Sequence, residues 1–171
     1  MNDVGDVTPI GQTLTPYSFF DDEGNAVEGA IIDPNSTDGQ DFIDGIIEGN
    51  PGLVEYVLNA RNDRDLDFKQ RNVNDRGSLT VEQYHYRGSV ASDGAFGSAR
   101  DFGNMAAGIV AGRRGLTWGQ ARAGFDAYDS YKRGSLGVEG APSQAAQRLG
   151  FIIGQSLRTN SLPPMPKRLR P

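Results

Sequence analysis

The sequence contains no cysteine and a single histidine, His85. Without cysteine the chain cannot form disulfides, thiolate zinc sites, iron–sulfur clusters or a cysteine nucleophile. One histidine also excludes metal sites built from several imidazoles. Hydrophobic residues make up only 37% of the chain, and no run approaches the roughly 18 apolar residues of a membrane span. The first residues lack the basic start and apolar stretch of a secretory signal.

Basic residues are absent from the first 50 positions, which carry 11 acidic residues. The remainder of the chain has a net charge of +6, of which the final stretch contributes +4. We therefore expect an acidic, loop-rich N-terminal extension (1–50), a central domain (51–157) and a basic, proline-rich tail (158–171). The acidic extension has two interpretations: it is a set of solvated loops, or it mimics nucleic acid and masks an active cleft.

The hydrophobic pattern predicts an α+β fold that is predominantly α-helical, with a small β element and an irregular N-terminal segment. Helices are expected at 39–49, 51–60, 98–112, 117–128 and 143–157. The β-branched and aromatic residues of 79–87 predict a strand. Thr117 and Gln120 fit a capping box, which indicates where the fourth helix begins.

Small residues along two of these helices predict how the helices pack. Gly150 and Gly154 are spaced so that another helix can approach closely. Gly103, Ala107 and Ala111 form a second line of small residues, where we also expect a neighbouring backbone. The larger residues of the last two helices, such as Phe125 and Ile152, are expected in the core.

Chemically reactive side chains are densest between residues 65 and 104. The candidate catalytic residues are Asp67, Lys69, His85, Arg87, Asp101 and Asn104. Each also has a structural interpretation: a carboxylate in the first turn of a helix, such as Asp101, is favoured by the helix dipole alone. No spacing matches a nucleotide-binding or metal-binding fingerprint, so we predict no cofactor and assign no metal site. The carboxylates of Asp65, Asp67 and Asp101 leave oxygen ligation of Mg²⁺ or Ca²⁺ as an open alternative.

Two hydrolytic schemes are compatible with these residue types. In the first, Asp101 or Glu82 acts as acid or base with Asp67 as its partner, as glycoside cleavage requires. In the second, His85 is the general acid or base, and the nearby Lys69 and Arg87 stabilise a phosphorane during metal-independent RNA cleavage. The residue spacing alone does not decide between them.

Four motifs follow one another along about residues 60–155. They are DFKQ at 67–70, YRG at 86–88, DFGN at 101–104 before a Gly/Ala-rich helix, and SQ at 143–144 followed by Gln147 and Gly150. In this order they resemble the bacterial polymorphic toxin type 44 family. Leu66 stands where that family usually has tryptophan, and the stretch between the third and fifth helices does not align.

The resemblance implies an antibacterial effector toxin, with 51–157 as the toxin domain. Such domains are secreted, for example by type VI secretion, delivered into a rival bacterium, and neutralised by a cognate immunity protein. The resemblance also implies which positions matter. These are Asp67, Lys69, Asp101, Gly103 and Asn104 first, and His85, Arg87 and Gln147 second.

We expect such a toxin to be a hydrolase of peptidoglycan in the periplasm of the target cell. The lack of cysteine suits an oxidising compartment, and residues 51–157 have a net charge of only +2, which is small for a nucleic-acid binder. The alternative is a metal-independent ribonuclease toxin acting in the target cytoplasm. A non-enzymatic interaction or pore-forming module is the third possibility.

Overall fold

The computed structural model of the chain describes residues 11–60, 64–69 and 79–161. Within them the fold is mainly helical with one small antiparallel hairpin, so the predicted fold class is confirmed. In chain order the elements are α1 (Asp38–Gly49), α2 (Leu53–Asn59), α3 (Val81–His85), β1 (Gly88–Val90), β2 (Phe96–Ser98), α4 (Ala99–Arg113), α5 (Trp118–Arg133) and α6 (Ala141–Ser161).

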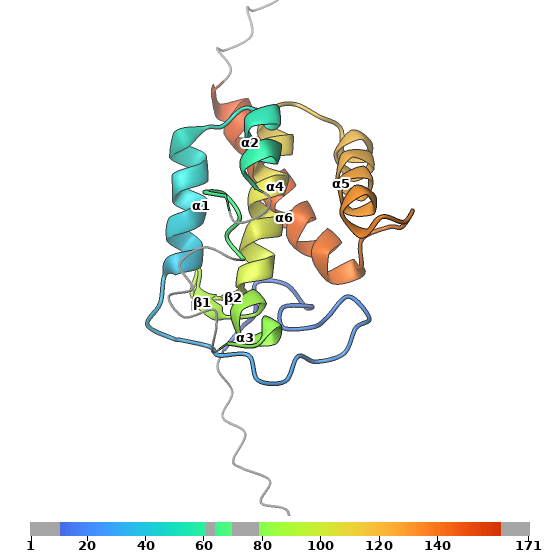
Figure 1. Cartoon of the computed structure of the whole chain (residues 1–171). Helices are drawn as coiled ribbons and strands as arrows, with labels where there is room; N and C mark the ends of the chain where they lie inside the picture. Colours follow the sequence, from blue (N-terminus) through green and yellow to red (C-terminus); the bar gives the residue numbers. More distant parts are fainter. Residues whose placement is uncertain (1–10, 61–63, 70–78, 162–171) are drawn as a thin grey trace, which may run out of the picture.

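Helices α4 and α6 form the centre of the molecule, with α1 on one side and α5 on the other (Figure 1). Glycines let the two central backbones touch. A Cβ on Gly150 would lie 1.9 Å from the carbonyl oxygen of Met105, and one on Gly108 would lie 2.1 Å from that of Gln147. Gly154 faces α4 in the same way, so the predicted close packing of Gly150 and Gly154 is confirmed.

The main core lies between α1, α4 and the segment that follows α2. Phe102 of α4 is completely buried, and Phe42 of α1 stacks on Phe68 with ring centroids 4.5 Å apart. Tyr56 of α2 is buried in the same cluster. Side chains from both sides of the expected boundary at residue 50 therefore share one hydrophobic core.

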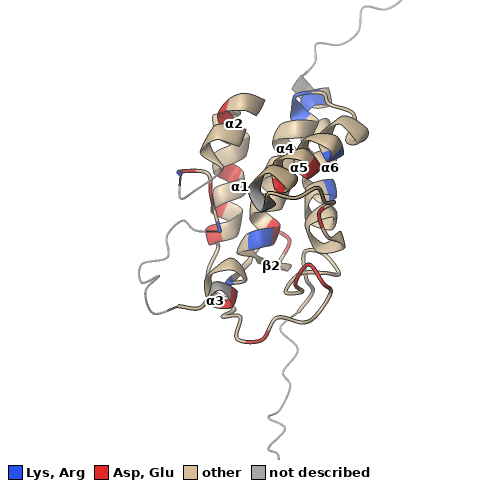
Figure 2. Ribbon diagram, turned by 45° about the vertical axis from the view of Figure 1, so that its right-hand side comes forward, with Lys and Arg blue, Asp and Glu red and all other residues tan. Residues whose placement is uncertain are grey.

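Residues 11–37 are irregular, as the sequence predicts, and lie across the hairpin end of the helices. Leu14 donates a backbone hydrogen bond of 2.7 Å to the carbonyl of Phe96 in β2. Arg100 of α4, whose side chain is almost fully buried, forms an ion pair of 3.3 Å with Asp22. Figure 2 shows acidic positions along these loops and basic positions along α6. The acidic segment is thus attached to the helical body.

The predicted strand at 79–87 is wrong, because Val81–His85 forms the short helix α3. Thr80 accepts a hydrogen bond from the backbone of Gln83, and the Gln83 side chain accepts one of 2.8 Å from the backbone of Thr80. This capping box starts a helical turn despite the β-branched and aromatic composition. Strand structure begins only at Gly88.

The other helices begin close to their predicted positions. Ser98 caps α4, and Thr117 with Gln120 forms the predicted capping box of α5. The expected burial of Ile152 is wrong: this side chain is 53% exposed, whereas its neighbour Phe151 is buried against α4. Beyond residue 161 the expected basic tail lies outside the described residues. None of the described helices is long and apolar enough to cross a membrane.

Candidate functional site

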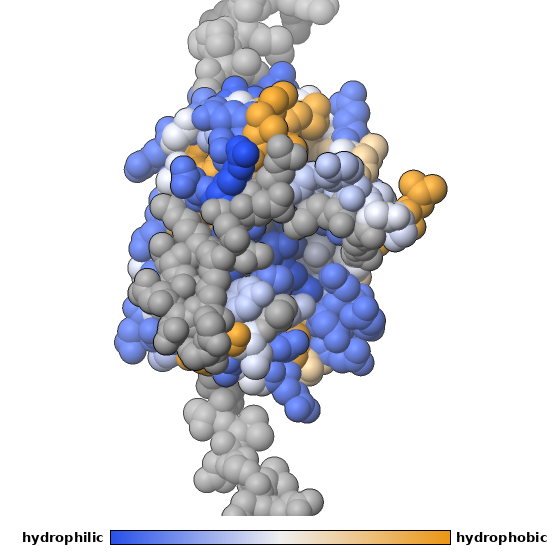
Figure 3. Space-filling model, viewed as in Figure 1, coloured by the Kyte–Doolittle hydropathy of each residue, from blue (hydrophilic) through white to orange (hydrophobic). Residues whose placement is uncertain are grey.

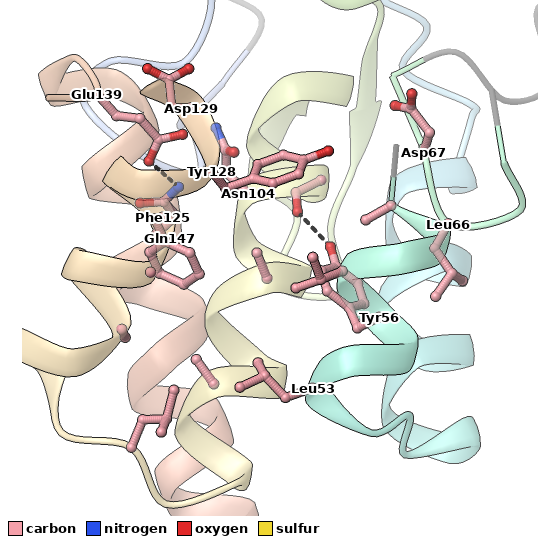
Figure 4. A pocket seen from close by; sticks show the side chains of 18 of the residues that line it. Leu53, Tyr56, Leu66, Asp67, Asn104, Phe125, Tyr128, Asp129, Glu139 and Gln147 are labelled. Atoms are coloured by element: carbon pink, nitrogen blue, oxygen red, sulfur yellow. Dashed lines mark hydrogen bonds between the residues drawn. The ribbon is translucent and has the colours of Figure 1, made fainter. Parts of the chain in front are cut away.

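A cleft opens between α2 with residues 66–69 on one side and α5 on the other, and α4 forms its floor (Figure 4). It holds about 1080 Å³ of space, part of it open to solvent. Its polar lining residues are Tyr56, Asp67, Lys69, Asn104, Gln120, Tyr128, Asp129, Glu139 and Gln147. Apolar side chains supply much of the remaining wall, a combination typical of ligand-binding sites.

The hollow exists because α4 presents small residues to it. Gly103, Ala107 and Ala111 follow one another at intervals of four along the helix and all line the cleft. We expected another backbone to approach along this line. At Gly103 a Cβ would meet only the Lys69 side chain, at 3.9 Å, whereas the close approach to α6 occurs at Gly108. The space next to these small side chains is left to the cleft.

One wall of the cleft carries Asp67 and Lys69, which flank the buried side chain of Phe68. Arg87 fixes this segment, because its guanidinium donates hydrogen bonds of 2.5 Å to the Phe68 carbonyl and 2.9 Å to the Lys69 carbonyl. The same guanidinium stacks 4.7 Å from the Phe68 ring centroid. Arg87 therefore acts as a positioning residue for Asp67, which is only 8% exposed.

The opposite wall carries Glu139, at the connection between α5 and α6. Its carboxylate accepts hydrogen bonds from the side-chain amide of Gln147 at 2.6 Å and from Arg122 at 3.3 Å. Burial raises the pKa of Glu139, and the nearby Asp129 raises it further, whereas Gln147 and Arg122 lower it. The pKa remains above the ordinary value, so Glu139 keeps its proton to higher pH than an exposed glutamate.

Two tyrosines stand between these walls. Tyr56 is buried and donates a hydrogen bond of 3.2 Å from its hydroxyl to the Gly103 carbonyl. Burial raises the pKa of Tyr56, and the charges of Asp67 and Tyr128 raise it further. Asp67 and Tyr128 line the cleft from opposite sides (Figure 4). Tyr56 stays protonated and remains a hydrogen-bond donor.

Asn104 lies on the floor of the cleft, between the acidic residues of the two walls (Figure 4). Its side chain is only 8% exposed, and its amide nitrogen Nδ2 is buried. Among the described residues, that nitrogen has no hydrogen-bond partner. Buried amide groups in proteins nearly always have one, so the Asn104 amide is a donor that a molecule entering the cleft could use.

Three of the six sequence candidates line the cleft: Asp67, Lys69 and Asn104. Arg87 lies behind the wall and supports it. His85 belongs to α3, where its ring meets that of Tyr84 at 4.7 Å, and it is not among the lining residues. The structure therefore does not bring His85 together with Lys69 in the cleft.

Asp101 also lies outside the cleft, because it is completely buried at the start of α4. Its carboxylate accepts hydrogen bonds from the backbone of Ser98 at 2.9 Å and from the Ser98 hydroxyl at 2.8 Å. The backbone of Asp101 returns a hydrogen bond to the same hydroxyl. These contacts support the structural interpretation of Asp101 as a helix-capping residue.

The cleft also contains polar residues that we did not select from the sequence, above all Glu139, Asp129 and Tyr128. Glu139 stands alone in a glycine-rich connection, so no local motif marks it. The one sequence signal that leads to it is Gln147, which the family resemblance singles out. Gln147 is buried and contacts Glu139 directly, but sequence spacing does not show this contact.

Apolar surface continues from the cleft onto the outside of the protein. Val57 of α2 lines the cleft and is itself 41% exposed, and the neighbouring Val54 is 72% exposed. A second exposed group, Leu136 and Val138, lies on the loop after α5. Figure 3 shows hydrophobic surface at the top of the molecule, over α2, and at its right edge, over the loop after α5. The side of the cleft formed by α2 is thus apolar up to its rim.

Two further expectations concern what occupies or covers this site. None of residues 11–37 lines the cleft, so the described part of the acidic extension does not mask it. Within the described residues, no group of three or more histidine, aspartate or glutamate side chains is placed to hold a metal ion. The acidic extension instead contacts the hairpin and the start of α4.

The chain was compared with models of known protein families, with curated proteins and with solved structures. None of these comparisons gives a match. The relationship to polymorphic toxins therefore stays a prediction that rests on the sequence motifs.

Proposed function

We propose that this chain is a hydrolase that cleaves glycosidic bonds in the glycan strands of peptidoglycan, and that the reaction takes place in the cleft. The observation that carries the proposal is a pair of carboxyl groups on opposite sides of the cleft. Glu139, with its raised pKa, lies on one side of the cleft, and Asp67 lies on the other (Figure 4).

Glycoside hydrolysis requires an acid and a carboxylate on either side of the scissile bond. Glu139 supplies the acid: it transfers its proton to the glycosidic oxygen as the bond to the anomeric carbon breaks. Asp67 supplies the carboxylate, which either deprotonates the attacking water or attacks the anomeric carbon itself. In both cases one water is consumed, and the strand ends in a new reducing sugar.

The charge of the lining favours a sugar over RNA. Asp67, Asp129 and Glu139 are acidic, and Lys69 is the only basic residue among the described lining residues. Such a cleft repels phosphate groups, whereas a neutral glycan can use its aromatic walls and hydroxyl donors. A ribonuclease toxin, the alternative function, would need His85 or a comparable base next to the substrate, and His85 does not line the cleft.

The biological role in the proposal is that of a secreted antibacterial toxin domain, and it rests on the sequence motifs. Peptidoglycan lies in the periplasm of the target cell, so a delivery machinery must carry the chain there. The producing cell would need a cognate immunity protein in its own periplasm. The acidic cleft mouth is the surface that such an inhibitor would have to block.

Purified sacculi provide the direct test. The wild-type chain is expected to release soluble fragments with new reducing ends, detected by chromatography and mass spectrometry. Glu139→Gln and Asp67→Asn should each lower the rate by at least about 100-fold, because each removes an essential carboxyl group. Asp65→Asn is the matched control: Asp65 is exposed and does not line the cleft, so the rate should not change.

A second measurement addresses the compartment. Expression with a periplasmic export signal should stop growth and produce rounded or lysed cells, while cytoplasmic expression should be harmless. Intact sacculi together with degraded ribosomal or transfer RNA would reject the proposal and favour the ribonuclease alternative.

A further inference from the structure

We infer that Asn104 forms a subsite for the acetamido group of a 2-acetamido-2-deoxy sugar, so that the cleft selects N-acetylated glycan strands. The inference rests on the proposed function for its view of the cleft as a glycan site. It concerns recognition, however, and recognition can be measured without bond cleavage.

The Asn104 side chain is buried on the floor of the cleft. It is 8% exposed, and its Nδ2 has no hydrogen-bond partner in the described part of the chain. Removing an amide from water without giving it a partner is unfavourable for folding. Such a group on the floor of a cleft is therefore explained when a ligand supplies the missing acceptor.

The charge of the cleft walls limits which hydrogen-bond acceptor fits next to Asn104. The acidic residues on the walls, Asp67 and Asp129 among them, disfavour an anionic ligand oxygen at this place. The acceptor should therefore be neutral. A carbonyl oxygen accepts a hydrogen bond from an amide N–H with ordinary geometry, and an acetamido group presents such an oxygen.

Small residues line the floor of the cleft around the Asn104 amide. Gly103 and Ala107 line the floor next to Asn104, and neither carries a side chain larger than a methyl group. A flat acetamido group can lie on this floor, with its carbonyl toward Asn104 and its methyl group on apolar surface. A sugar hydroxyl in its place would satisfy the amide but leave the apolar floor uncovered.

Peptide bonds are the other source of neutral carbonyls in peptidoglycan, so the test includes them. Binding is measured by isothermal titration calorimetry with three probes: a tetramer of N-acetylglucosamine, the corresponding tetramer of glucose, which is also neutral but lacks the acetamido groups, and a free stem peptide. Wild-type protein is expected to bind the acetylated tetramer at least about tenfold more tightly than the other two.

Two substitutions assign that preference to Asn104. Asn104→Leu keeps the branched shape of the side chain but has no donor, and Asn104→Asp replaces the donor with a carboxylate. Both should reduce the preference for the acetylated tetramer to within about twofold. Asn160→Leu is the control, since Asn160 is exposed near the end of α6, and it should bind as the wild type does.

Thermal unfolding checks that loss of binding is not loss of folding. Asn104→Leu should unfold at the same or a higher temperature than the wild type, because it removes a buried amide that lacks a partner. A clear decrease in the unfolding temperature would mean that the amide has a structural role, and it would overturn the inference.

The remaining outcomes separate this inference from the proposed function. Equal binding of both tetramers, binding of neither, or preferred binding of the stem peptide would overturn the acetamido subsite, even if sacculi are still cleaved. A preference for the acetylated tetramer that depends on Asn104 would support the subsite, even if sacculi remain intact and the hydrolase proposal fails.

Discussion

Gln147 donates a hydrogen bond of 2.6 Å from its side-chain amide to the carboxylate of Glu139. Its backbone carbonyl lies only 2.1 Å from the position that a Cβ on Gly108 would occupy. Gln147 of α6 thus lies at the glycine-mediated contact between α4 and α6 and also contacts the acidic wall of the cleft. The close approach of α4 and α6 sets how far Gln147 reaches toward Glu139.

A methyl group added where α4 and α6 touch should lower the stability of the protein. Gly150→Ala would place a Cβ 1.9 Å from the Met105 carbonyl, so the helices must move apart, and we expect about 1–3 kcal/mol less stability. Gly45→Ala is the matched control in α1, where nothing lies within 4 Å. It should stabilise the helix by about 0.5–1 kcal/mol. Urea unfolding measures the free energy of unfolding of both variants. Equal changes for Gly150→Ala and Gly45→Ala would contradict the close contact between α4 and α6.

Gln147→Met keeps the approximate volume of the side chain and removes the hydrogen bond to Glu139. Because that hydrogen bond lowers the pKa of Glu139, the substitution should raise the pKa further. The basic limb of the pH–rate profile on sacculi, which reports the proton of the general acid, should shift to higher pH. A lower rate with an unchanged profile would mean that Gln147 acts on something other than this proton.

The raised pKa of Glu139 also predicts how stability depends on pH. A carboxyl group whose pKa is higher in the folded than in the unfolded state contributes stability below its unfolded pKa. That contribution is lost as the pH rises through the folded pKa. The free energy of unfolding should therefore decrease as the pH rises above the unperturbed value of 4.5. In Glu139→Gln, the free energy of unfolding should fall less over this pH range. Denaturant unfolding at several pH values measures it, and the same pH dependence in the variant and the wild type would contradict a raised pKa of Glu139.

Asp101 is expected to act on stability and not on chemistry. Asp101→Ala removes the acceptor of both Ser98 hydrogen bonds in a completely buried site, so we expect a loss of about 1–3 kcal/mol. Asp101→Asn retains an acceptor oxygen and should cost less, with sacculus cleavage close to that of the wild type. A stable but inactive Asp101→Asn protein would show that the carboxylate has a catalytic role after all.

The neighbouring residues Phe151 and Ile152 provide a test of the packing of α6. Phe151 is 1% exposed and meets the ring of Trp118 at 5.3 Å, whereas Ile152 is 53% exposed. Phe151→Ala should cost about 3–5 kcal/mol through the cavity that it leaves. Ile152→Ala should change stability by less than about 0.5 kcal/mol. Similar losses for the two variants in thermal unfolding would mean that α6 is rotated from the described position.

The sequence alone determined most helix positions, because a helix start depends on groups within a few residues of each other. The capping box of Thr117 and Gln120 is recognisable from their spacing along the chain, and so is the close-packing pattern of Gly150 and Gly154. The same kind of signal overrode β-propensity at Thr80, where a capping box starts α3 in a segment whose composition predicts a strand.

Only the tertiary structure decided which polar side chains face one another. Asp67 reaches the cleft because Arg87, far along the chain, holds the carbonyls of Phe68 and Lys69. Glu139 belongs to the site because α6 folds back against α4. Contacts of this kind depend on packing between segments that are distant in the sequence, so the local spacing of residues does not predict them. The helices could therefore be predicted from the sequence, whereas the acidic cleft between them could not.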